Sequence, residues 1–177
     1  MRTRTKPGRT IKRPVLVILV CIAAAANCAP RSAGWQTPVF SVRDIDGKTV
    51  SSAELKGKVI IANFWATWCP PCRAEIPDFV EFYNRTKSKG LEIIGFSVDA
   101  LTGGPATADE IRPFVRMNRM TYPVVIASVK IVGDFDPGDA IPATFIIDRE
   151  GRIRHKQVGG IDLDSLEDWF RRLSAEK

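Results

Sequence analysis

Two cysteines, Cys69 and Cys72, are the side chains of this chain best suited to do chemistry. They follow the apolar run 59–62, which is typical of a buried strand. They precede a segment with apolar residues at helical spacing, namely Ile76, Phe79, Val80 and Tyr83. We therefore expect the pair where a strand ends and a helix begins, and there unpaired N–H groups and the helix dipole favour a thiolate. A thiolate with a second thiol one turn away can attack a disulfide and then resolve the mixed disulfide, so the spacing favours dithiol–disulfide exchange.

The same spacing is also found in half of a zinc site, which needs two more Cys or His ligands. His155 is the single histidine of the chain, so redox chemistry is the better interpretation. His155 follows alternating residues and is predicted to lie on a strand surface rather than to act as a base.

The net charge of +6 comes from one end of the chain. Six basic residues and no acid lie in residues 1–13, whereas residues 27–177 hold 20 Lys or Arg and 20 Asp or Glu. Nucleic-acid binding would call for basic residues clustered on the folded domain, so we exclude it. Apolar residues make up 45% of the chain, which predicts a folded protein with a core.

The N-terminus has the pattern of an export signal. The basic stretch precedes twelve uncharged residues, 15–26, and Ala24 and Ala26 suit a peptidase. Cys28 offers lipidation instead, and an uncleaved membrane anchor is the third alternative, although the apolar run is short for a span. We expect residues 1–28 to be a signal or anchor, 29–37 a tether and 38–177 the domain.

The domain reads as a mixed α/β unit. We expect a hairpin around Asp46-Gly47, then a capped helical turn at 51–55. A strand at 59–65, a helix after Cys72 that runs to about Lys87 and a strand at 91–99 follow. A helix capped by Thr107, a strand at 122–127, a hairpin of 144–148 with 152–158 and a C-terminal helix complete the order. Residues 128–140 fit a strand or a helical turn. The order predicts a central mixed sheet with helices on its faces.

This pattern resembles a thioredoxin fold. Residues 64–72, FWATWCPPC, match the thioredoxin signature FWAEWCGPC at seven of nine positions. Pro77 stands where thioredoxins kink the active-site helix, and Ile141-Pro142 stands where they have a cis-proline. The resemblance covers roughly residues 38–175 and implies a three-layer α/β/α sandwich, here with an N-terminal hairpin extension.

Within this superfamily the chain is similar to the TlpA/ResA group of exported, membrane-tethered thiol–disulfide oxidoreductases, in the redoxin (AhpC/TSA-like) class. The export segment, the N-terminal hairpin and Glu75 carry this likeness, because the group has an acid three places after the second cysteine. Asn63 stands where cytoplasmic thioredoxins have a buried Asp. The resemblance implies no cofactor beyond a Cys69–Cys72 disulfide.

Each site residue receives an expected role. Cys69, nearer the helix start and more exposed than Cys72, is the expected attacking thiolate, and Cys72 is the expected resolving thiol. Glu75 either shuttles the Cys72 proton or is a solvated carboxylate of the first helical turn. Pro142 is either cis and beside Cys69, where the backbone could pair with a substrate, or a plain turn proline. Residues expected to contact substrate are Trp68, Pro70, Pro71 and Ile141; Trp68 is favoured as partly exposed, and the two prolines stiffen the loop.

Two alternative functions remain. A thiol peroxidase would need the motif P-x-x-x-T-x-x-C, but Ala62 and Ala66 occupy its Pro and Thr positions. A copper-delivery protein would use Cys69, Cys72 and His155, although that family spaces its cysteines by three residues. The resemblance favours a reductant of partners such as apocytochrome c, supplied with electrons by a transmembrane donor of the CcdA/DsbD type.

Overall fold

The computed structural model describes Met1 and residues 35–176. Residues 2–28 of the expected signal or anchor segment and residues 29–34 of the tether lie outside the described residues. In the described part of the chain, no helix has both the length and the apolar character needed to cross a membrane.

A six-stranded mixed sheet forms the middle layer of the domain. Its strand order is β1-β8-β7-β4-β5-β6. The strands are β1 (Trp35–Gln36), β4 (Val59–Trp65), β5 (Leu91–Ser97), β6 (Val124–Ile126), β7 (Ala143–Ile147) and β8 (Arg152–Val158). β5 is parallel to both β4 and β6, whereas β7 is antiparallel to its neighbours β4 and β8. β4 and β5 are covered on both faces, which explains their nearly continuous apolar sequences.

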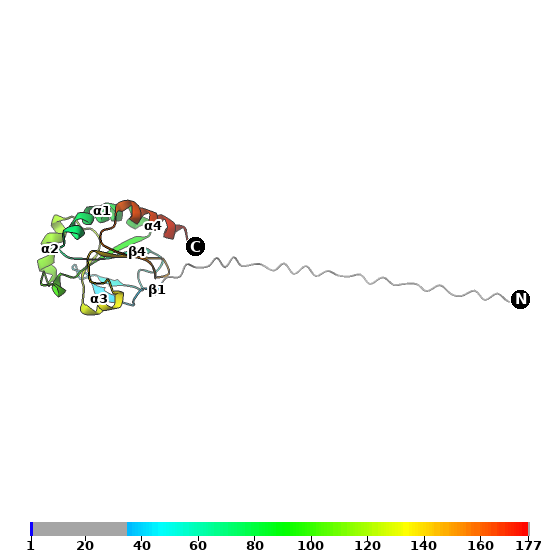
Figure 1. Cartoon of the computed structure of the whole chain (residues 1–177), viewed down its shortest axis with the longest axis horizontal. Coiled ribbons are helices and arrows are strands. Elements are labelled where there is room, and N and C mark those ends of the chain that lie inside the picture. The colour runs from blue at the N-terminus through cyan, green and yellow to red at the C-terminus, as the bar shows by residue number, and fades with distance from the viewer. Residues whose placement is uncertain (2–34, 177) are drawn as a thin grey trace. The chain divides into compact units, whose positions relative to one another are not determined.

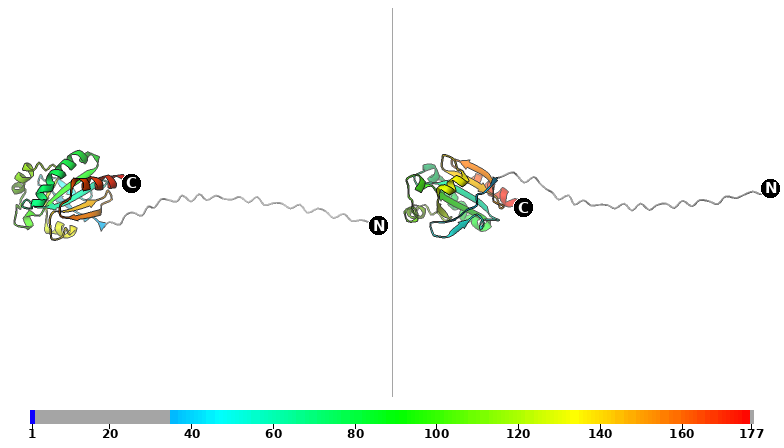
Figure 2. Two further views of the ribbon diagram at one scale, coloured as in Figure 1. Left: turned by 45° about the horizontal axis from the view of Figure 1, so that its top comes forward. Right: turned by 90° about the horizontal axis from the view of Figure 1, so that it is seen from below.

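Helices cover both faces of this sheet. α1 (Pro70–Thr86) and α4 (Leu163–Ala175) lie together on one face, and α3 (Val129–Phe135) lies on the other (Figure 1). α2 (Ala108–Met117) joins the α1 face, because Phe114 stacks on Trp65 and Arg73 lies over the Phe114 ring. In Figure 2 strands β7 and β8, in orange, lie between α4 and α3. The predicted three-layer thioredoxin-like architecture is confirmed.

A cluster of phenylalanines fills the layer between the sheet and α3. Phe135 of α3 lies 5.4–5.9 Å, between ring centroids, from four other rings, those of Phe40, Phe64, Phe96 and Phe145. All five side chains are buried. Close aromatic pairs add to the free energy gained from burial, so this cluster stabilises the packing of α3 on its face of the sheet. The cysteines are carried at the start of α1, on the opposite face.

The N-terminal hairpin forms as expected, from β2 (Ser41–Arg43) and β3 (Thr49–Ser51). Asp44 stabilises its turn, since its carboxylate accepts hydrogen bonds from the backbone N–H groups of Asp46 and Lys48 at 2.9 and 2.8 Å. Gly47 has a φ of 79°, which glycine adopts without strain. Residues 52–57 form turns, and the Glu54 N–H donates to Ser51 Oγ at 3.4 Å, so the expected cap at Ser51 is present without a regular helix after it.

Two expected boundaries are wrong. Trp35 and Gln36, placed in the tether, pair with Ile153 and Arg152 of β8, so the folded unit includes them. Helix α1 begins at Pro70 rather than after Cys72, because a proline is well suited to the first helical position, whose N–H has no partner within the helix. Of the two alternatives for residues 128–140, the helical one is confirmed, because residues 129–135 form α3, capped by the Ser128 side chain.

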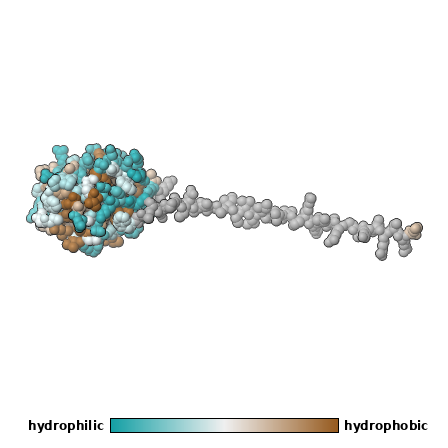
Figure 3. Space-filling view, viewed as in Figure 1, coloured by the Kyte–Doolittle hydropathy of each residue, from teal (hydrophilic) through white to brown (hydrophobic). Residues whose placement is uncertain are grey.

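Much of the surface seen in Figure 3 is hydrophilic, with smaller hydrophobic areas between.

Candidate active site

The two cysteines form a disulfide at the start of α1. Their Cα atoms are 5.3 Å apart and the sulfurs are bonded at 2.10 Å. Cys69 is the N-cap residue, and its Sγ accepts a hydrogen bond from the Cys72 N–H at 3.3 Å. The helix start thus directs an N–H group at the Cys69 sulfur, as the strand–helix junction predicted, and this contact favours negative charge on that atom.

Both sulfurs are covered in this oxidised form. Cys69 is 2% exposed and Cys72 is 0% exposed, so Cys69 is the more exposed of the two, as expected, but the disulfide leaves it almost no contact with solvent. The segment before β7 lies over it, and the Ile141 carbonyl oxygen is 3.8 Å from Cys69 Sγ.

The Ile141–Pro142 peptide bond is cis. Pro142 is buried and its carbonyl accepts a hydrogen bond from the Gly159 N–H at 2.8 Å. The cis alternative for Pro142 is therefore confirmed, together with its place beside Cys69.

Glu75 is a buried carboxyl, one helical turn beyond Cys72 and only 6% exposed. Its Oε1 accepts a hydrogen bond from Asn63 Nδ2 at 2.9 Å, and its Oε2 accepts one from the Ile161 N–H at 3.2 Å. Asn63 Nδ2 also donates to Thr144 Oγ1 at 3.0 Å, across the β4–β7 pairing. The alternative of a solvated first-turn carboxylate is excluded by this burial.

Burial raises the pKa of Glu75 from 4.5 to about 7, because desolvation penalises the carboxylate. The hydrogen bonds from Ile161 and Asn63 lower the pKa but do not cancel that effect. The result is a group that changes its protonation near neutral pH beside the second cysteine of the pair, which suits a proton carrier.

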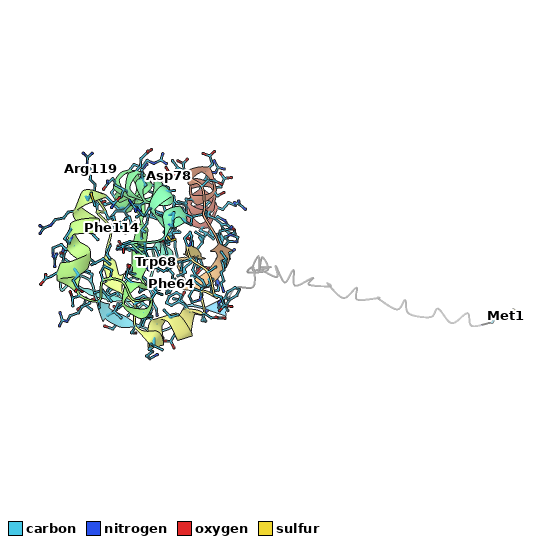
Figure 4. The ribbon with its side chains drawn as sticks, turned by 60° about the vertical axis from the view of Figure 1, so that its left-hand side comes forward. Met1, Phe64, Trp68, Asp78, Phe114 and Arg119 are labelled. Atoms are coloured by element: carbon cyan, nitrogen blue, oxygen red, sulfur yellow. A yellow bond between two sulfur atoms is a disulfide. The ribbon has the colours of Figure 1, made fainter. Side chains whose placement is uncertain are left out.

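Trp68 lies at the surface beside the disulfide. It is 52% exposed, on the side of the domain that Figure 4 brings forward. Its indole Nε1 donates to Thr102 Oγ1 at 3.0 Å. Pro70 and Pro71 are exposed in the first turn of α1, and the expected partial exposure of Trp68 is confirmed, whereas Trp65 is buried in the core.

His155 does not join the cysteines. It is half-buried on β8 and stacks on Trp169 of α4, with ring centroids 5.0 Å apart. Among residues 35–176, no group of three or more His, Cys, Asp and Glu side chains is placed to hold a metal ion. The three-ligand copper site of Cys69, Cys72 and His155 is therefore not formed.

The sequence analysis did not identify residues that contact the site from distant parts of the chain. Thr144 and Ile161 contact Asn63 and Glu75, and the β5–α2 loop contacts the segment before Cys69 through Asp99 and Thr102. The available signal was Ser97 and Asp99, polar residues at the end of an apolar strand next to the strand that leads to Cys69.

Several known proteins that are similar to this chain carry the name thiol–disulfide oxidoreductase. Residues 33–156 match the AhpC/TSA family. The thiol-disulfide oxidoreductase ResA of a Bacillus cereus strain is 31% identical over 178 residues, covering 96% of this chain and 99% of that protein. ResA of Bacillus subtilis (strain 168) is 30% identical over 167 residues, covering 90% of each chain.

Solved structures agree with this assignment. A thiol:disulfide interchange protein of the thioredoxin family from Chlorobium tepidum TLS superposes with a TM-score of 0.73 at 31% identity, over 82% of this chain and 99% of that one. The chain therefore belongs to the AhpC/TSA family, among thioredoxin-fold thiol–disulfide oxidoreductases similar to ResA.

Proposed function

We propose that this thiol–disulfide oxidoreductase is exported and reduces disulfides in partner proteins, with apocytochrome c as the candidate partner. The observation that carries the mechanism is the Cys69–Cys72 pair at the start of α1 with the buried Glu75 one turn further along. This arrangement supplies a nucleophile, a resolving thiol and a proton acceptor on one helix.

The exchange takes place in two steps on the reduced protein. The Cys69 thiolate attacks one sulfur of the partner disulfide, which forms a mixed disulfide and releases the other partner sulfur as a thiolate that takes up a proton. Cys72 then loses its proton and attacks Cys69 Sγ, so the second partner sulfur leaves. The partner gains two electrons and two protons, and the protein is left with the Cys69–Cys72 disulfide.

Glu75 is proposed as the acceptor of the Cys72 proton in the second step. Residues at i and i+3 are neighbours on a helix surface, which places the carboxyl close to Cys72. With a pKa of about 7, Glu75 is ionised in a large fraction of molecules at neutral pH and holds the proton weakly enough to release it again.

Partner contacts are proposed along the edge of the disulfide. Trp68, Pro70 and Pro71 are exposed next to Cys69 in the chain, and the Ile141 carbonyl oxygen lies 3.8 Å from Cys69 Sγ. An extended partner segment laid beside Ile141 would bring its sulfur to Cys69, while the Trp68 ring offers an apolar contact.

Export and electron supply are proposed from the N-terminal sequence and the resemblance. The basic stretch followed by residues 15–26 has the pattern of a secretory signal, with a lipid on Cys28 or a retained anchor as alternative tethers. A reductant outside the cytoplasm needs electrons from across the membrane, so a transmembrane donor of the CcdA/DsbD type is the proposed source.

Two measurements test this function. A Cys72→Ser variant should accumulate a mixed disulfide through Cys69 with its partner, and Cys69→Ser should not. The reduction potential of the pair should lie near that of thioredoxin, at about −270 mV, and a value near about −120 mV would instead identify a disulfide donor. Failure to trap any disulfide-containing protein through Cys69 would count against exchange with protein partners.

A further inference from the structure

A second buried carboxylate lies behind the segment that leads to Cys69. Asp99 belongs to a short 3₁₀ turn, η2 (Asp99–Leu101), at the end of β5 and is 0% exposed. None of the ion pairs found in residues 35–176 includes Asp99. A buried carboxylate without a cation is costly unless hydrogen-bond donors satisfy it.

Those donors come mainly from Thr67, two residues before Cys69. The Thr67 N–H lies 3.1 Å from both carboxylate oxygens, and Thr67 Oγ1 donates to Oδ1 at 2.6 Å. Ser97 Oγ donates to Oδ2 at 2.7 Å. The carboxylate therefore fixes both the backbone and the side chain of Thr67.

The rest of the β5–α2 loop is fitted to this carboxylate. The Gly104 N–H donates to the Asp99 carbonyl at 2.8 Å, and a Cβ at Gly104 would lie only 2.6 Å from Asp99 Oδ1. Thr102 Oγ1 donates toward the Val98 and Asp99 carbonyls and accepts from the Trp68 indole. Two consecutive residues before Cys69, Thr67 and Trp68, are thus held by one loop from a different part of the chain.

We propose that Asp99 is a positioning residue for the thiol–disulfide reaction: by holding Thr67, it sets where the Cys69 sulfur lies at the start of α1. The reaction needs the sulfur placed both for attack on a partner and for the later attack by Cys72. Displacements of about 1 Å in such a group can cost about a hundredfold in rate. This inference rests on the proposed exchange reaction and adds the group that aligns its nucleophile.

The test compares Asp99→Ala with Asp99→Asn in the full chain. The asparagine oxygen can still accept from the Thr67 N–H and hydroxyl, and its NH2 group can donate to the Ser97 hydroxyl oxygen. Arg154→Gln is the matched control, because it breaks ion pairs of Arg154 with Asp148 and Glu176. Asp148 follows the last residue of β7, whereas Pro142 precedes the first, so the control acts at the opposite end of that strand.

Two readouts are measured for each folded variant: the rate at which the reduced protein attacks 2-hydroxyethyl disulfide from pH 6 to 9, and its redox equilibrium with glutathione. We expect Asp99→Ala to be slower by at least about tenfold at every pH and to shift the equilibrium by at least about threefold. Asp99→Asn should stay within about threefold of the native rate, and Arg154→Gln should match the native protein despite its lower stability.

If Asp99→Ala fails to fold, substitutions of Thr67, the donor of the hydrogen bond to Asp99, provide the same test. Thr67→Ser keeps the hydroxyl and should react at the native rate, whereas Thr67→Val should be slower by at least about threefold. The double variant Asp99→Ala with Thr67→Val should be no slower than Asp99→Ala alone, because both changes remove one interaction.

Several results would overturn the proposal: native rates in Asp99→Ala, equal losses in Asp99→Ala and Asp99→Asn, equal losses in the Arg154→Gln control, or additive losses in the double variant. If the native protein itself exchanges no disulfide, the proposed function fails, which is a different outcome from native exchange that is indifferent to Asp99.

Discussion

At the scale of single residues, one proton on Glu75 links the stability of the domain to its chemistry. Its carboxyl is buried and accepts hydrogen bonds from Asn63 and Ile161, yet desolvation still holds its pKa near 7. In the unfolded chain the same group ionises near 4.5. Between these values the folded state binds the proton more tightly than the unfolded state does.

The sign of the resulting pH dependence follows directly. Burial makes the charged form of Glu75 less favourable in the folded state than in the unfolded state. The free energy of unfolding should therefore fall as the pH rises from about 4.5 to 7, by up to about 3 kcal/mol. Glu75→Gln should remove this decrease. Urea unfolding of the oxidised protein at pH 5 and pH 8 measures it, and parallel losses in both proteins would show that another group is responsible.

A substitution of Asn63 should change the pKa of Glu75 without removing its carboxyl. Asn63→Asp would place a second carboxyl where the amide now donates to Glu75, and two adjacent buried carboxyls resist joint ionisation. The midpoint of the pH dependence for mixed-disulfide resolution should rise by about one unit or more. Stopped-flow resolution rates give this midpoint, with Thr86→Ser, a conservative change at the far end of α1, as control. An unchanged midpoint would separate Glu75 from the resolving step.

At the scale of elements, α1 and α3 have different roles on the two faces of the sheet. α1 carries the cysteines and Glu75, whereas α3 closes the phenylalanine cluster on the other face. The reactive helix can therefore be held in place by packing that contains no reactive group.

Phe135→Ala tests this division. Removing a buried ring from the cluster should lower the free energy of unfolding by about 3–5 kcal/mol, because the loss of burial leaves a cavity. Val129→Ala, at an exposed position of the same helix, should change it by no more than about 0.5 kcal/mol. Disulfide exchange by the folded fraction should persist in both. If Phe135→Ala lowers the free energy of unfolding no more than Val129→Ala does, the phenylalanine cluster contributes little to the stability of the domain.

At the scale of the whole domain, β1 is the edge strand of the sheet and pairs with β8. Trp35 and Gln36 pair with Ile153 and Arg152, and the Thr37 N–H donates to the Gly151 carbonyl at 2.8 Å. The segment thought to be a tether is thus in part an edge strand.

A truncation pair measures what this edge contributes. A chain starting at residue 35 keeps β1, and a chain starting at residue 38 loses it. We expect the shorter chain to unfold at a lower urea concentration, since it loses the β1–β8 hydrogen bonds at about 1 kcal/mol each. Equal midpoints for the two chains would contradict a stabilising role for β1.

The sequence by itself determined what is encoded locally. The Cys69–Cys72 spacing after an apolar run, the Asp46-Gly47 hairpin and the Thr107 cap of α2 each depend on residues a few positions apart, and each appears in the structure as expected. The resemblance around residues 64–72 then indicated the fold, because few architectures combine these elements in this order.

Only the tertiary structure decided what depends on distant contacts. Glu75 is buried because Asn63 and Ile161, from β4 and the segment before α4, meet it across 12 and 86 positions. Asp99 reaches Thr67 across 32 positions, and β1 finds its partner at the opposite end of the domain sequence. Polar side chains at such places look alike in sequence whether they face water or each other. Their pKa values and roles follow from desolvation and hydrogen bonding, which exist only once the chain has folded.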